Sequence, residues 1–308
     1  MSRFTDEYKI KYEGCLKRVQ KPARYIGNEF GSVHKKWSDD MLTFAFCFPD
    51  VYEVGMSHLG MKILYHMLNE REDTVCERVF APWDDMEQEM RKEGIPLLSM
   101  ESYVPVKNFD FIGFTLQYEM SYSNIVNMLD LAGVPLRTAE RTAGDPFVCC
   151  GGPCAYHAEP LSDLVDFFIL GEGEEVNSEI MDVYKEWKNS GSTDRDDFLM
   201  SIIPLGGVYV PKFYDVEYND DNTISRFEPN REGVPKQVRK RIILNMDNTY
   251  VPKKLIVPFM ETVHDRIMLE LFRGCIRGCR FCQAGYIYRP VRERSVDKLV
   301  ETAGECIK

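Results

Sequence analysis

The stretch LTFAFCFPDVYEVGMSHLGMKILYHMLNE, residues 42–70, carries the pattern that determines the fold class. Residues 42–48 form a short, almost continuous apolar run, as in a strand that is covered on both faces. A turn-rich loop follows, and residues 61–70 then place their apolar side chains at helical spacing. The stretch therefore predicts a buried strand, a loop and a helix, which together are one unit of an α/β sheet.

The same unit recurs along the chain. Further predicted strands lie at residues 74–82, 110–116, 146–152 and 165–171, and helices follow at residues 84–94, 123–133 and 177–189. Strands separated by helices, at about 30 residues per unit, predict an α/β fold with a doubly wound parallel sheet. Ligands of such sheets bind beyond the carboxyl ends of the strands.

Glycine and small polar residues are concentrated at those predicted strand ends. Glycine lets the backbone approach a flat ligand closely, because it has no side chain. The candidate ligand-binding residues are Gly55, Ser57, His58, Thr115, Gly151, Gly152, Gly171 and Gly173.

A second informative stretch, RGCIRGCRFCQAG, occupies residues 273–285. Its cysteines, Cys275, Cys279 and Cys282, have the spacing C-x3-C-x2-C. Three thiolates can hold a [4Fe–4S] cluster and leave one iron free for a substrate or cofactor. A structural zinc site is the alternative reading, but zinc usually takes four ligands, and no further cysteine or histidine stands at suitable spacing.

Residues 267–274 predict a buried strand before the cysteines, and residues 295–308 predict a helix after them. Strand, three-cysteine loop and helix resemble the start of the barrel of radical S-adenosylmethionine (SAM) enzymes. Only 26 residues follow Cys282, and a single βα unit cannot close a barrel. We therefore expect this chain to be the N-terminal part of a longer enzyme.

Longer motifs narrow the resemblance to the radical SAM proteins that carry a B12-binding domain, in which a flavodoxin-like sheet precedes a partial TIM barrel. The motifs are KPARYIGNE, PDVYEVGMSHLG, ERVFAPWDDME, DFIGFTLQYE, GGPCAYHAEPL, GEGE, GVYVPKFY, VHDR and RGCIRGCRFCQAG. The resemblance implies a cluster on the three cysteines, SAM beside Phe281 and cobalamin at the strand ends. It implies reductive cleavage of SAM, with methyl transfer if cobalamin binds, and an electron donor such as flavodoxin or ferredoxin.

One departure concerns cobalt ligation. Enzymes that bind cobalt through histidine use an Asp-x-His-x-x-Gly loop, whereas His58 stands only two residues before Gly60. Two interpretations of His58 are therefore open. It is either a cobalt ligand, or a residue that caps the first helix or lines the pocket without binding a metal.

Two other functions stay open. One is a non-catalytic module that binds a corrinoid or a partner. The other is methylthiotransfer to RNA or protein, which needs further cysteine ligands. Cys149, Cys150 and Cys154 are the candidates, although adjacent residues in a strand point to opposite faces.

Several charged residues also have two readings. Arginines near the cysteines either bind an anionic substrate or the SAM carboxylate, or pair with nearby acids. Glu172 and Glu174 are expected to cap the helix that follows them, and His157 with Glu159 is a candidate acid–base pair. The arginines are Arg273, Arg277, Arg280, Arg289, Arg292 and Arg294.

The pattern divides the chain into an N-terminal extension (residues 1–40), the α/β domain (41–195), a β-rich connector (196–260) and the start of the barrel (261–308). Within the connector, residues 220–222 predict a hairpin turn.

Composition restricts the cellular setting. Ten cysteines without a signal peptide indicate reduced thiols and metal ligation, so we expect a cytoplasmic protein. A net charge of −11 argues against a general nucleic-acid surface, and no apolar run is long enough to span a membrane.

Overall fold

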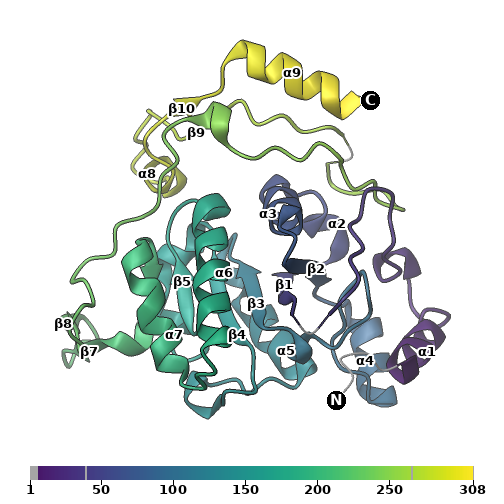
Figure 1. Cartoon of the computed structure of the whole chain (residues 1–308), viewed down its shortest axis with the longest axis horizontal. Helices are drawn as coiled ribbons and strands as arrows, with labels where there is room; N and C mark the ends of the chain where they lie inside the picture. Colours follow the sequence, from purple (N-terminus) through teal and green to yellow (C-terminus); the bar gives the residue numbers. More distant parts are fainter. Residues whose placement is uncertain (1–5, 39, 265, 308) are drawn as a thin grey trace.

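The computed structural model describes residues 6–38, 40–264 and 266–307 (Figure 1). Asp265 of the VHDR motif, the first residues of the polar N-terminus and Lys308 lie outside the described part.

A six-stranded sheet in the order β2-β1-β3-β4-β5-β6 forms the centre of the molecule. The first five strands are parallel, and β6 runs antiparallel to β5. The order 2-1-3-4-5 is that of flavodoxin-like sheets, so the predicted doubly wound α/β fold is confirmed. The strands are β1 (Leu42–Phe48), β2 (Thr74–Phe80), β3 (Phe111–Thr115), β4 (Phe147–Gly151), β5 (Phe167–Ile169) and β6 (Val208–Tyr209).

Helices cover both faces of the sheet (Figure 1). The chain crosses from β1 to β2 through α3 and then reverses direction, so right-handed connections place α4 and α5 on the face opposite α3. On the α3 face, Phe111 packs against Tyr184 of α6 and Phe198 of α7, at ring-centroid distances of 4.6 and 5.8 Å. The helices are α1 (Asp6–Cys15), α2 (Tyr52–Gly55), α3 (Leu59–Glu70), α4 (Asp84–Glu93), α5 (Tyr122–Ala132), α6 (Gly173–Asn189) and α7 (Arg195–Ile202).

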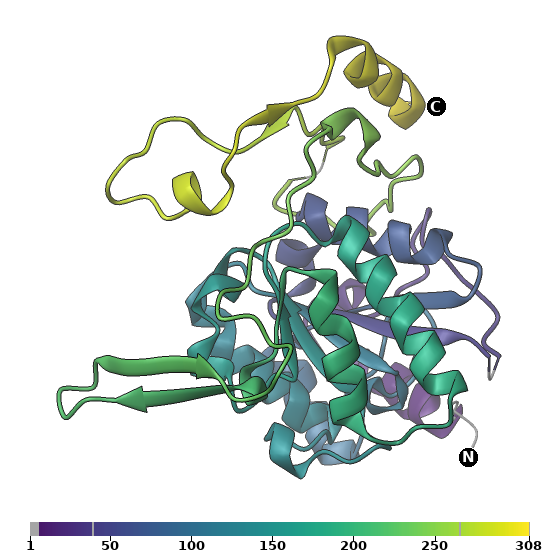
Figure 2. The ribbon, with the colours of Figure 1, turned by 60° about the vertical axis from the view of Figure 1, so that its left-hand side comes forward.

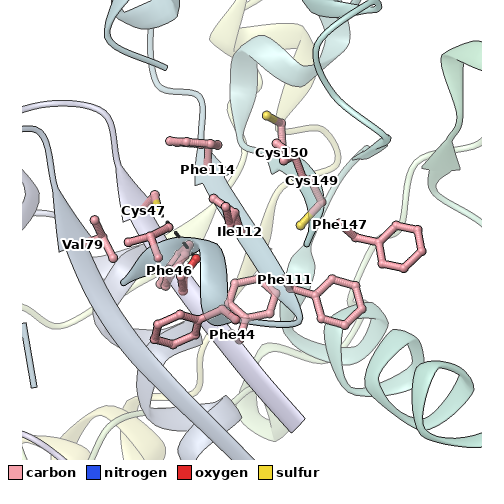
Figure 3. Packing of buried hydrophobic residues seen from close by; sticks show 14 of the residues in the cluster. Phe44, Phe46, Cys47, Val79, Phe111, Ile112, Phe114, Phe147, Cys149 and Cys150 are labelled. Atoms are coloured by element: carbon pink, nitrogen blue, oxygen red, sulfur yellow. Dashed lines mark hydrogen bonds between the residues drawn. The ribbon is translucent and has the colours of Figure 1, made fainter. Parts of the chain in front are cut away.

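The core explains why the strand sequences are almost continuous runs of apolar residues. Every residue of β1 and β2 is buried, because each strand has helices or connecting segments on both faces. Figure 3 shows the aromatic side chains of β1, β3 and β4 packed together, with the sulfurs of Cys149 and Cys150 pointing apart. The opposite orientation of these two adjacent cysteines was expected for a strand.

The outer edge of β2 is closed by buried charges. Arg78 of β2 pairs with Glu29 of the N-terminal extension and with Glu101, each at 2.6 Å. Lys35 donates to the Thr74 carbonyl at 2.7 Å, and Met100 N–H donates to the Arg78 carbonyl at 2.9 Å. These bonds occupy backbone groups that an exposed edge strand would leave open.

A β-hairpin projects from the sheet (Figure 2). It consists of β7 (Tyr214–Tyr218) and β8 (Ile224–Pro229), and Asn219 and Thr223 close its turn, as predicted around residues 220–222. Within residues assigned by sequence to the connector, β6 is the sixth strand of the sheet, and α7 packs against the sheet through Phe198. Short 3₁₀ segments are Pro22–Arg24, Val106–Asn108, Glu119–Ser121, Thr138–Glu140, Pro153–His157, Glu159–Leu161, Ile203–Leu205, Pro211–Phe213 and Met246–Asn248.

The C-terminal segment corrects one prediction. The buried strand expected at residues 267–274 is only β9 (Phe272–Arg273), paired antiparallel with β10 (Arg292–Glu293). Leu271 and Phe272 are 53% and 56% exposed. Because β9 pairs only with the two residues of β10, no larger sheet covers these two side chains. The predicted helix is confirmed as α9 (Val296–Ile307), and α8 (Ala284–Ile287) lies within the loop.

None of the helices described is both long and apolar enough to cross a membrane.

Candidate ligand pocket and cysteine loop

A cavity of about 440 Å³ opens at the carboxyl ends of the parallel strands. A volume of this size is within the range of small-molecule sites. Among the residues predicted for ligand binding, the cavity brings together His58, Thr115, Gly151, Gly152, Gly171 and Gly173.

The inner part of the cavity is apolar. Phe44 and Phe46 of β1 line it on the sheet side, and Ile63 and Leu64 of α3 line it on the helix side. Gly113 lets the Phe44 ring pack directly against β3, because a Cβ atom there would lie 2.3 Å from that ring. This lining suits a flat or apolar group placed between the sheet and its helices.

The outer part of the cavity comes from the segment that carries the cysteines. Glu270, Phe272, Arg273, Gly274 and Tyr288 all line it. Sequence reasoning did not assign these residues to the pocket. The available signal was local: Arg273 and Gly274 immediately precede Cys275.

Gly55 and Ser57 do not line this cavity. A Cβ atom at Gly55 would lie 2.4 Å from the Phe80 ring, so this glycine allows α2 to pack closely on the sheet. The Ser57 hydroxyl donates to the Glu53 carbonyl at 2.7 Å and accepts from His264 N–H at 3.0 Å. Ser57 therefore ties the VHDR segment to α2.

His58 is a helix cap that also lines the cavity. Its Nδ1 accepts a hydrogen bond from Met61 N–H at 3.1 Å, at the start of α3. Burial lowers the pKa of His58, which favours the neutral ring. With Nδ1 accepting, the neutral ring carries its proton on Nε2. Cobalt ligation through Nε2 would require the proton to move to Nδ1 and the cap to break, so the geometry supports the capping interpretation.

Two of the predicted glycines serve backbone contacts as well as the cavity. Gly152 has φ = 100°, and Gly171 has φ = 103°, a region that favours glycine. A Cβ atom at Gly171 would lie 2.2 Å from the Arg241 carbonyl oxygen, because the connector pairs with the chain there.

The three cysteines of the loop are accessible to solvent, whereas most other cysteines of the chain are buried. Cys279 is exposed, and Cys275 and Cys282 are partly exposed. Across the described ranges, no three His, Cys, Asp or Glu side chains are arranged to hold a metal ion. The donor set nevertheless fits an iron–sulfur cluster chemically, because three thiols stand on one loop with glycines at its bends.

Phe281 is 93% exposed and does not line the cavity. Its predicted contact with SAM stays a prediction.

The GEGE motif contacts the cysteine segment through ion pairs. Glu174 and Arg273 are 2.5 Å apart, and Glu172 accepts from Arg292 at 2.6 Å. Glu172 occupies the N-cap position of α6 and Glu174 lies in its first turn, as predicted, but the Glu172 side chain makes no capping hydrogen bond. Burial opposes the charge of Arg273, but its hydrogen bonds with Glu270 and Glu174 outweigh burial and raise its pKa.

Four of the six arginines near the cysteines divide into two groups. Arg273, Arg292 and Arg294 pair with acids, as one of the two readings expected. Arg289 instead stacks over the Tyr286 ring at 4.5 Å.

The remaining candidates have structural partners. Cys149, Cys150 and Cys154 are buried, and burial raises the pKa of the Cys154 thiol to about 11, which disfavours a thiolate. His157 contacts Gln283 at 3.1 Å and Glu119 at 3.5 Å. Glu159 accepts from the Tyr209 hydroxyl, so the predicted His157–Glu159 pair is not formed.

Comparison with known proteins identifies one family match. Residues 60–211 match the family model described as radical SAM proteins, N-terminal. The uncharacterized protein MJ0966 of Methanocaldococcus jannaschii is 24% identical over 265 residues, which is 86% of this chain. The match covers 46% of that protein, so the chain spans about half the length of this relative. No solved structure matches the chain.

Proposed function

We propose that this chain, whose residues 60–211 are similar to the N-terminal region of radical SAM proteins, is part of a radical SAM enzyme with a corrinoid-type ligand in its pocket. Cys275, Cys279 and Cys282 would hold a [4Fe–4S] cluster, which when bound supplies the electron that cleaves SAM. An electron donor such as flavodoxin or ferredoxin would reduce it. The observation that carries the proposal is that one cavity is lined both by the strand ends and by the residues next to Cys275.

The residues of the chain have separate tasks under this proposal. The strand-end glycines leave space for a flat ring, and the apolar wall of β1 and α3 excludes water from the inner cavity. His58 stays a helix cap, so a corrinoid would bind without a histidine from this loop. Cobalamin when bound would carry a methyl group taken from SAM, and we propose transfer of that methyl group to a carbon atom of the substrate as the reaction.

A second candidate is a non-catalytic module that binds a corrinoid. It is favoured by the finding that the cysteines are not brought together among the described residues. Its pocket would be the same, and only the cluster separates the two functions.

Ligand binding to the whole chain tests the proposal. The chain is reconstituted with iron and sulfide without oxygen, and equilibrium dialysis then measures binding of hydroxocobalamin and of SAM. Binding of both supports the enzyme. Binding of hydroxocobalamin without a cluster or SAM supports the module, and binding of neither contradicts both functions.

A further inference from the structure

The base of the cysteine loop is a short ladder with an unfavourable charge pattern. Arg273 of β9 lies directly opposite Arg292 of β10, and the loop with the three cysteines runs between them. Like charges that face each other across two strands repel and destabilise the pair. A two-residue ladder provides little to offset this repulsion. The base of the loop therefore needs a counter-charge.

Glu172, at the start of α6, supplies that counter-charge to Arg292, and it shares the neutralisation of Arg273 with Glu174 and Glu270, which lie 2.5 and 2.7 Å from that guanidinium. The Glu172 carboxylate accepts from Arg292 Nη1 at 2.6 and 2.7 Å, and lies 3.5 Å from Arg273 Nη1. The same carboxylate accepts from Ile243 N–H at 2.5 Å. The side chains of Glu172, Arg273 and Arg292 are only 13%, 12% and 7% exposed, so solvent screens these contacts weakly.

Glu172 is also part of the pocket. It follows Gly171 at the end of β5, and both residues line the cavity together with Arg273. A ligand that orders the GEGE loop therefore acts on the residue that holds both ends of the cysteine loop. Conversely, a cluster that orders the loop fixes Arg273 and Arg292, and through them Glu172.

We propose that Glu172 is a positioning residue that anchors the cysteine loop and couples it to the pocket, so that pocket ligand and cluster strengthen each other's binding. The coupling rests on the proposed function, whereas the anchoring does not. Linkage requires the coupling to be reciprocal: each ligand changes the affinity of the other by the same factor.

Limited proteolysis tests the anchoring without any ligand. Trypsin cuts after arginine, and Arg277 and Arg280 lie exposed within the loop. In E172Q we expect cleavage at these sites about tenfold faster than in the wild type, since the loop opens more often when its base is weakened. The matched control is E175Q, because Glu175 is 59% exposed, pairs with Arg241 and does not line the cavity. Its cleavage rate should stay within twofold of the wild type.

Urea unfolding of both variants separates anchoring from general damage to the fold. Faster cleavage with an unchanged unfolding midpoint supports a local role. Equal cleavage rates in E172Q and E175Q overturn the anchoring, and so does a fall in the midpoint of E172Q that accounts for the faster cleavage.

The coupling is tested by the hydroxocobalamin dissociation constant before and after iron–sulfide reconstitution. In the wild type and in E175Q we expect reconstitution to tighten binding by at least about fivefold. In E172Q the ratio should fall towards one. A wild-type ratio in E172Q overturns the coupling although the proposed function stands. If the chain binds neither hydroxocobalamin nor a cluster, both the proposed function and the coupling are refuted. The proteolysis experiment still decides whether Glu172 anchors the loop.

Discussion

Filling the pocket from the end of β4 is expected to weaken ligand binding while leaving the fold intact. Gly151 lines the cavity, and a Cβ atom there would have only Ile169 as a neighbour, at 3.9 Å. Its φ is not in the left-handed region, so valine fits the backbone. In G151V an isopropyl group therefore enters space that a ligand would occupy.

The size of the effect follows from crowding of a packed site. Forcing added methylene groups into occupied space costs about 1–3 kcal/mol, which corresponds to about 5- to 150-fold in a dissociation constant. Equilibrium dialysis with hydroxocobalamin measures it for the wild type, G151V and the control G144V. Gly144 has comparable free space around its Cβ position but lies outside the cavity. Equal affinities of G151V and G144V would refute the placement of the ligand, and so would a wild-type chain that binds none.

Two further predictions concern buried charge. Burial lowers the pKa of His66 to about 4, below the roughly 6.5 of an unfolded chain. Protonation of His66 is therefore easier in the unfolded chain than in the folded one. The stability is fully present above pH 6.5, and the free energy of unfolding should fall by about 2 kcal/mol between pH 7 and pH 5. Urea unfolding at both pH values should show this loss reduced in H66F; an unchanged pH dependence would contradict it. R78M should lower the free energy of unfolding by about 3–5 kcal/mol, because Glu29 and Glu101 would stay buried without their partner. Urea unfolding measures the loss of stability in R78M. We expect partial recovery of the free energy of unfolding when Glu29 and Glu101 are also changed to glutamine. A loss below about 1 kcal/mol in R78M would show that the network is dispensable.

The sheet was predictable because its signals are local. The apolar run of β1 and the helical spacing of α3 lie within one stretch of chain, and both elements formed where expected. Gly94 ends α4 with φ = 65°, as a glycine after a helix indicates. The alternation of strand and helix predicted the parallel, doubly wound sheet, whereas the order of its strands comes from the structure.

The candidate site was only half predictable, because its other half depends on contacts between distant residues. The strand-end glycines mark the cavity from sequence, but Phe272 and Tyr288 reach it only through the path of the connector. Glu172 has the pattern of a helix cap, and its pairing with Arg292 joins residues 120 positions apart. The apolar run before Cys275 resembles a strand, yet an extended segment needs partner strands, and β10 supplies only two residues.

Cluster binding by Cys275, Cys279 and Cys282 is tested most directly by electron paramagnetic resonance of the reduced, reconstituted chain, with and without SAM. We expect a cluster signal that is lost in C275A, C279A and C282A, persists in the control C306A and changes when SAM is added. C306A is a suitable control because Cys306 lies in α9, outside the loop. Absence of a cluster signal, or a signal that survives the three loop substitutions, would show that these cysteines do not hold the cluster.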